Sequence, residues 1–136
     1  MTVTYATGVK TNRLNVVNAT INSQTINAAT GTGSAGKLVI GTSALSGATG
    51  VLATLPLNNP AGTVSGNTFT LTTTGVSATA TNTGTAALAE LRNSSDVTVV
   101  SGLTVGSTGT PDITISATAI SSGQTVTLTS GTITHG

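Results

Sequence analysis

A chain of 136 residues is long enough to bury a substantial core as one domain, yet only 5% of its residues are charged and 1% are aromatic. The formal net charge of +1 argues against a nucleic-acid partner, and the lack of cysteine excludes disulfides and thiol chemistry. About a quarter of the residues are threonine, whose branched side chain favours strands. The composition therefore predicts a sheet protein that hydroxyl groups keep soluble.

Residues 1–30 are predicted to form an N-terminal arm. Within "VKTNRLNVVNATI", residues 9–21, three apolar side chains recur at the spacing i, i+3 and i+7, namely Leu14, Val17 and Ile21. This spacing is typical of one face of a helix, so a short helix is predicted here, although asparagine and threonine weaken it.

The arm is basic. Three of the four cationic residues lie in it or just after it, namely Lys10, Arg13 and Lys37, and the first acidic residue is Glu90. No apolar run near the start has the length of a secretory signal, and none elsewhere approaches a membrane span. We therefore expect assembly in the cytoplasm, no membrane partner, and an arm that can be deleted without unfolding residues 37–136.

The stretch "GTGSAGKL", residues 31–38, satisfies the G-x-G-x-x-G pattern of nucleotide-binding loops. A phosphate loop needs a buried strand before it, a helix after it, and a hydroxyl residue following the lysine. Here a polar segment precedes the glycines, the strand-like "LVIG" follows, and Leu38 takes the place of the hydroxyl residue. We interpret 31–36 as a glycine-rich joint and predict no cofactor.

From residue 37 onward, apolar and polar residues alternate with a period of two, the pattern of strands with one wet face. About eight short strands are predicted, at 37–40, 51–57, 67–73, 76–80, 87–91, 97–105, 113–115 and 126–128. Turn-forming residues separate them, and Phe69 is expected in the core. Gly131 interrupts the last alternation, so a bulge is expected there.

This spacing of strands predicts two packed antiparallel sheets over residues 37–136, a β-sandwich. A jelly roll is favoured and an immunoglobulin-like sandwich is the alternative. No repeat of fixed length is visible, which argues against a solenoid.

The titratable residues form no catalytic pattern. Glu90 and Arg92 lie two residues apart on one strand and therefore face the same side, where a solvated ion pair is expected. Asp96 and Asp112 stand in turns, and His135 is expected to be an exposed residue of the C-terminal tail. We therefore predict neither enzymatic activity nor a metal site.

The layout resembles a known class of viral proteins. The "VKTNRLNVV" arm is followed by the glycine joint, by "GTAALAELRNSSDVTVVSGLTVG" and by the closing "ISSGQTVTLTSGTIT". Together these segments resemble the small head decoration, or cement, proteins of tailed bacteriophages. The resemblance covers most of the chain, which has fewer charges and aromatic residues than is typical of that family.

The resemblance implies a structural protein of the virion, a β-sandwich on the outside of the head that bridges subunits of the major capsid protein and stabilises the expanded shell. The expected capsid contacts are Tyr5, Lys10, Arg13, Leu14, Val17 and Lys37. Self-association is expected, with a dimer favoured over a trimer. The alternative function is a receptor-binding, fibre or adhesin module of a virion or cell surface.

Overall fold

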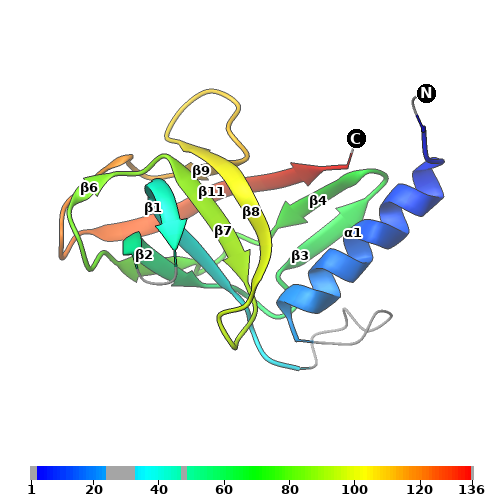
Figure 1. Cartoon of the computed structure of the whole chain (residues 1–136), viewed down its shortest axis with the longest axis horizontal. Coiled ribbons are helices and arrows are strands. Elements are labelled where there is room, and N and C mark those ends of the chain that lie inside the picture. Colours follow the sequence, from blue (N-terminus) through cyan, green and yellow to red (C-terminus); the bar gives the residue numbers. More distant parts are fainter. Residues whose placement is uncertain (1–2, 24–32, 47–48, 136) are drawn as a thin grey trace.

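The computed structural model describes residues 3–23, 33–46 and 49–135 (Figure 1). These residues contain one helix, α1 (Thr7–Ile21), and a series of strands. The strands are β1 (Lys37–Ser46), β2 (Thr49–Pro56), β3 (Gly62–Ser65), β4 (Thr68–Leu71), β5 (Ser77–Thr79), β6 (Gly84–Thr85), β7 (Leu88–Arg92), β8 (Thr98–Gly106), β9 (Ile113–Ile115), β10 (Ala119–Ile120) and β11 (Thr125–Thr134).

Most of the strands belong to one large curled sheet with the order β2-β1-β7-β8-β9-β11-β4-β3, in which β5 also pairs with β11. β6 and β10 form a separate pair. The prediction of an all-β protein with a short N-terminal helix is confirmed. The jelly-roll or immunoglobulin-like sandwich stays a prediction, because the hydrogen-bonded order follows one continuous path.

The expectation of purely antiparallel pairing is wrong at one place, where the end of β8 runs parallel to β9. Parallel neighbours normally need a long crossover. Here the loop between β8 and β9 turns back on itself (Figure 1). The Asp112 carboxylate accepts hydrogen bonds from the N–H and the hydroxyl of Thr104, at 2.9 and 3.0 Å. These bonds hold β9 beside the end of β8.

The predicted alternation is clearest in β2 and the residue after it. Ala53, Leu55 and Leu57 are buried, whereas Thr54 and Pro56 are exposed. The same core contains Leu38, Ile40, Phe69, Leu91, Ile113 and Leu128. Apolar burial on one face therefore sets which side of each strand turns inward.

The bulge expected near Gly131 is confirmed by a shift of register between Leu128 and Ser130 in the pairing of β11 with β9. The shift turns Gly131 toward the core, where an added Cβ would lie 2.7 Å from Cδ1 of Leu71. Glycine is therefore required for the close approach of β11 to its neighbour.

The edge of β2 that faces away from β1 also accepts hydrogen bonds from the same chain. The N–H of Thr81 donates to the carbonyl of Leu52 at 2.9 Å, and the side-chain amide of Asn82 donates to the carbonyl of Val51 at 2.9 Å. Because Thr81 and Asn82 follow β5, which pairs with β11, the sheet curls until its two distant parts meet.

Helix α1 packs beside β3 and β4, the two strands at one end of the sheet order (Figure 1). Thr11 donates its hydroxyl proton to the carbonyl of Gly66, and Asn18 donates from its amide to the carbonyl of Gly62 at 3.0 Å. The two donors are seven residues apart and so share a helix face, and their acceptors stand at the two ends of β3. The helix thus covers the strand edge that would otherwise end the sheet.

The predicted helix exists, but it is not separate from the main domain. Leu14 and Ile21 are 3% and 0% exposed and belong to the same core as the strands. Gly36 lies against the end of α1, where a Cβ would be 2.5 Å from Cγ2 of Ile21. The expectation that residues 37–136 fold without the arm stays a prediction, and deletion of the arm would uncover the part of the core that Leu14 and Ile21 cover.

Replacing Leu14 with alanine should lower the free energy of unfolding by about 2–5 kcal/mol, because a buried side chain is lost and a cavity remains. Urea denaturation followed by circular dichroism measures this loss. The matched control is Val9→Ala on the same helix, where the side chain is exposed. A loss for Leu14→Ala no larger than that of the control would contradict the docking of α1.

Candidate functional site

The structure separates the six predicted contact residues into three groups. Tyr5 and Arg13 are exposed near the start of α1, and Lys10 is half-buried on the same helix. Leu14 is buried in the chain's own core, and Val17 packs against that core. Lys37 lies elsewhere, at the start of β1.

Tyr5, Arg13 and His135 form a cluster at the end of the molecule where the two termini meet (Figure 1). The guanidinium carbon of Arg13 lies 3.7 Å from the centre of the Tyr5 ring, a cation–π contact. Nη1 of Arg13 is 3.4 Å from Nε2 of His135, and the His135 ring stands edge-on to Tyr5. We call these three residues the terminal cluster.

The expectation of a frayed, exposed His135 is wrong. Its backbone N–H donates to the carbonyl of Asn67 at 2.8 Å, and the residue is half-buried. The turn between β3 and β4 thereby fixes the end of the chain beside α1. Sequence reasoning missed this because Asn67 and His135 are 68 positions apart.

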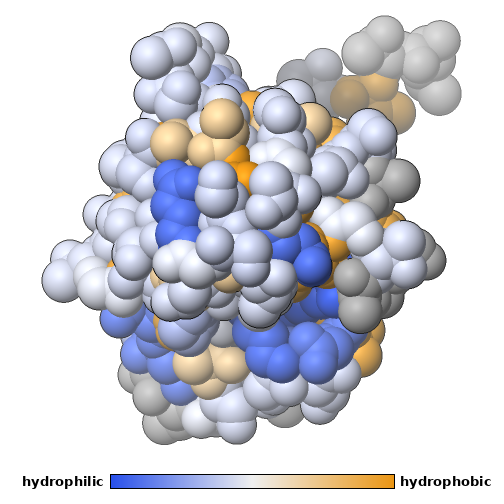
Figure 2. All heavy atoms as spheres, turned by 90° about the vertical axis from the view of Figure 1, so that its left-hand side faces the viewer, coloured by the Kyte–Doolittle hydropathy of each residue, from blue (hydrophilic) through white to orange (hydrophobic). Residues whose placement is uncertain are grey.

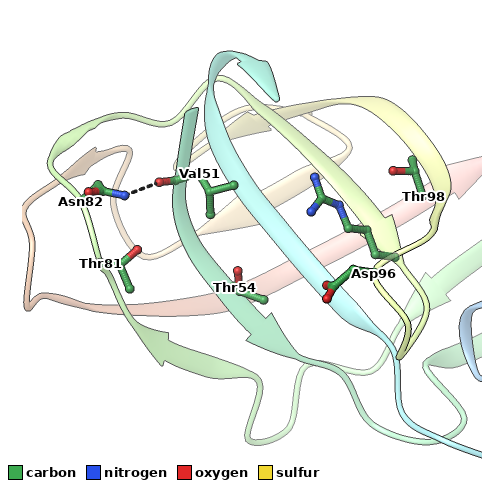
Figure 3. A pocket seen from close by; sticks show the side chains of 7 residues that line it. Val51, Thr54, Thr81, Asn82, Asp96 and Thr98 are labelled. Carbon is green, nitrogen blue, oxygen red and sulfur yellow. Dashed lines mark hydrogen bonds between the residues drawn. The ribbon is translucent and has the colours of Figure 1, made fainter. Parts of the chain in front are cut away.

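An open pocket of about 550 Å³ lies on the part of the sheet that contains β2, β7 and the start of β8. Its lining consists of Val51, Thr54, Thr81, Asn82, Arg92, Asp96 and Thr98. Figure 3 shows Thr54 and Asp96 on the two sides of β1, with Asn82 bonded to Val51 at one end and Thr98 at the other. We call this hollow the polar pocket.

Glu90 and Arg92 do face the same side, but they are not solvated as expected. Their side chains are only 13% and 9% exposed, and Nη2 of Arg92 lies 3.0 Å from Oε2 of Glu90. The same oxygen accepts hydrogen bonds from Nε of Arg92 at 3.0 Å and from the hydroxyl of Thr98 at 3.1 Å. Arg92, which lines the pocket, is thus held in one orientation.

A second ion pair joins Lys37 to Asp96, with Nζ and Oδ1 2.9 Å apart. Asp96 stands in the turn between β7 and β8, where Asn93 accepts hydrogen bonds from the N–H groups of Ser95 and Val97. The hydrogen bond from Lys37 holds the pKa of the Asp96 carboxyl below its ordinary value of 3.8. Asp96 is therefore a carboxylate at neutral pH.

The structure bears on two kinds of site that the sequence raised, a metal site and a phosphate loop. Among the described residues, no group of three or more His, Cys, Asp or Glu side chains could hold a metal ion. Lys37 begins a strand, so the helix that a phosphate loop requires does not follow the glycines. Gly31 lies outside the described residues, and Gly36 is a packing position. Within the described ranges, no helix is both long and apolar enough to cross a membrane.

Most residues of the polar pocket could not be identified from the sequence. The spacing of Glu90 and Arg92 on one strand was visible, but Thr54, Thr81 and Thr98 were three among many threonines. The curl of the sheet brings them together, and that curl depends on contacts between distant strands.

No protein-family model matches the chain, and neither a curated protein sequence nor a solved structure shows significant similarity to it.

Replacing Glu90 with alanine should lower the free energy of unfolding by about 3 kcal/mol, because the buried guanidinium of Arg92 loses its carboxylate. Urea denaturation measures the loss. The matched control is Asp96→Asn, which removes the charge of the exposed pair and should cost much less. The double variant Glu90→Leu/Arg92→Met should recover part of the loss, since it removes both buried charges. Equal losses for Glu90→Ala and Asp96→Asn would contradict the burial of this pair.

The Lys37–Asp96 pair predicts a pH-dependent difference between the wild type and Asp96→Asn. The pKa of Asp96 is lowered in the folded state, so its stabilising effect is present above the ordinary value of 3.8 and is lost as the pH falls through the lowered pKa. The wild type should therefore have the higher melting temperature at pH 7, and the two should converge in acid. A difference that stays constant down to about pH 2 would contradict this assignment.

Proposed function

We propose that the chain is a structural decoration protein that binds the outer surface of a tailed-phage head and bridges neighbouring subunits of the major capsid protein. The resemblance of its sequence to such proteins supports this function. The structural observation that carries it is an exposed surface, both apolar and cationic, around the start of α1.

This surface contains most of the large apolar side chains that are exposed in the described part of the chain. Val3 is 63% exposed, Val9 42% and Tyr5 38%. Single exposed apolar residues are ordinary, but a group of them beside charged residues is typical of a contact surface. We call Val3, Val9 and the terminal cluster the terminal surface.

Arg13 gives the terminal surface its positive charge. Its guanidinium covers the Tyr5 ring, so an aromatic side chain and a cation are presented together, a pairing that is common at interface anchors. A capsid exterior that exposes carboxylates would complement this surface and would favour rapid association. Because the helix is docked on its own sheet, the surface would bind as a fixed platform rather than as a flexible arm.

The terminal surface of one copy would contact one capsid subunit, so bridging would require the expected self-association of two copies. Binding to the shell would also gain strength from repetition. Each copy would bury a small area, and the regular spacing of sites on a shell would let many copies contribute together. Self-association, with the dimer favoured, would add to this effect.

The test is cosedimentation of the purified full chain with tailed-phage heads that have been stripped of their surface proteins. We expect saturable binding at a fixed ratio to the capsid subunit, and at least tenfold weaker binding by Arg13→Glu. The control is Val97→Glu, which introduces the same carboxylate at an exposed position outside the terminal surface, in the turn between β7 and β8.

Two results would contradict the proposal. The absence of saturable binding across a panel of heads, combined with binding to intact host cells, would favour a receptor-binding module. Equal weakening by Arg13→Glu and Val97→Glu would mean that the terminal surface is not the contact.

A further inference from the structure

We propose that the polar pocket binds a neutral ligand rich in hydroxyl groups, of about the size of a monosaccharide. The pocket shares no residue with the terminal surface, so this inference does not depend on the proposed function. Its volume of about 550 Å³ falls within the range of roughly 300–1,000 Å³ that is typical of small-molecule sites.

The charges around the pocket exclude a strongly charged ligand. Arg92 is paired with Glu90, and Lys37 with Asp96, so each cation at the site has an anion within 3.0 Å. Of these four residues, Arg92 and Asp96 line the pocket. An anionic ligand would therefore meet the Asp96 carboxylate, and a cationic ligand would meet the Arg92 guanidinium. A neutral ligand avoids both repulsions.

The uncharged lining offers donors and acceptors together. Thr54 contributes a hydroxyl that can donate and accept hydrogen bonds. The hydroxyls of Thr81 and Thr98 donate to the Leu52 carbonyl and the Glu90 carboxylate, so they offer acceptor lone pairs to a ligand. The Asp96 carboxylate adds acceptors. A polyol requires this mixture, because each of its hydroxyls also both donates and accepts.

The lining is held in place before any ligand arrives. Arg92 is fixed by Glu90, Asp96 by Lys37, and the Asn82 amide by the carbonyl of Val51 at 2.9 Å. Fixed polar groups reduce the entropy lost on binding. Figure 3 shows the labelled lining residues around one hollow, although they come from β2, from the segment after β5, and from the turn into β8 and its first residue.

The apolar part of the site is modest. Val51 lines the pocket. Val39 of β1 is paired with Thr54 of β2 on one side and with Glu90 of β7 on the other, so it belongs to the same face of the sheet. Val39 is 1% exposed although it is not part of the main core. Because the lining contains no aromatic ring on which a sugar could stack, we expect a dissociation constant of about a millimolar.

The test is nuclear magnetic resonance titration of the ¹⁵N-labelled full chain. The probes are glucose, galactose, mannose and N-acetylglucosamine, with sodium sulfate and guanidinium chloride at low concentration as charged probes. We expect saturable shifts of backbone amides at 51–54, 81–82 and 92–98 with at least one sugar, and none there with the charged probes.

Two variants connect the shifts to the pocket. Thr54→Val removes one lining hydroxyl without changing the shape of the side chain and should weaken sugar binding at least tenfold. Thr63→Val, the same change at an exposed position of β3, should leave it unchanged. The amide spectra of both variants show directly whether they are folded.

Three results would overturn the proposal. One is the absence of saturable shifts with every sugar up to about 0.1 M, a hundredfold above the expected constant. Another is preferential binding of sulfate or guanidinium in the pocket. The third is sugar binding that Thr54→Val leaves unchanged.

Discussion

The fold depends on the docking of α1 against its own sheet. The helix is weak by itself: its N-terminus has no side-chain cap bond, and neither end has a charge that would favour the helix dipole. Its sequence is rich in asparagine, threonine and valine, which are poor helix formers. Its stability must therefore come from packing. In return, Leu14 and Ile21 complete the core while Thr11 and Asn18 bond the ends of β3, so helix and sheet stabilise each other.

Each of the three acidic side chains has a bonded partner. Glu90 bonds to Arg92, Asp96 to Lys37, and Asp112 to the backbone and hydroxyl of Thr104. Most of the remaining surface is neutral, and the face in Figure 2 is mostly pale, with limited strongly hydrophilic areas. This division explains how a protein with so little charge can still present two distinct surfaces. One is apolar and cationic at the termini, and the other is a hollow with balanced charge.

The sequence predicted the parts of the fold that local patterns encode. Strands β2, β7 and β8 follow from alternation, whereas β1 and β11 extend well beyond the predicted 37–40 and 126–128. The helix follows from the spacing of Leu14 and Ile21, and the bulge from the phase change at Gly131. β3 was not predicted because "GTVS" has a single large apolar residue, and β6 and β10 are two-residue pairs that only tertiary contacts define. Helical spacing shows which face is apolar but not what covers it. Local patterns also do not show which distant residues meet, so the partners of His135 and Lys37 could not be predicted.

The measurement that tests this account most directly is native-state hydrogen exchange of the amides in α1 and β7. If the helix and the sheet share one core, the most protected amides near Leu14 and Leu91 should exchange only through global unfolding, with the same opening free energy. If the amides of α1 exchange readily while those of β7 remain protected, the helix is a separate arm. That result would contradict both the shared core and the fixed terminal surface.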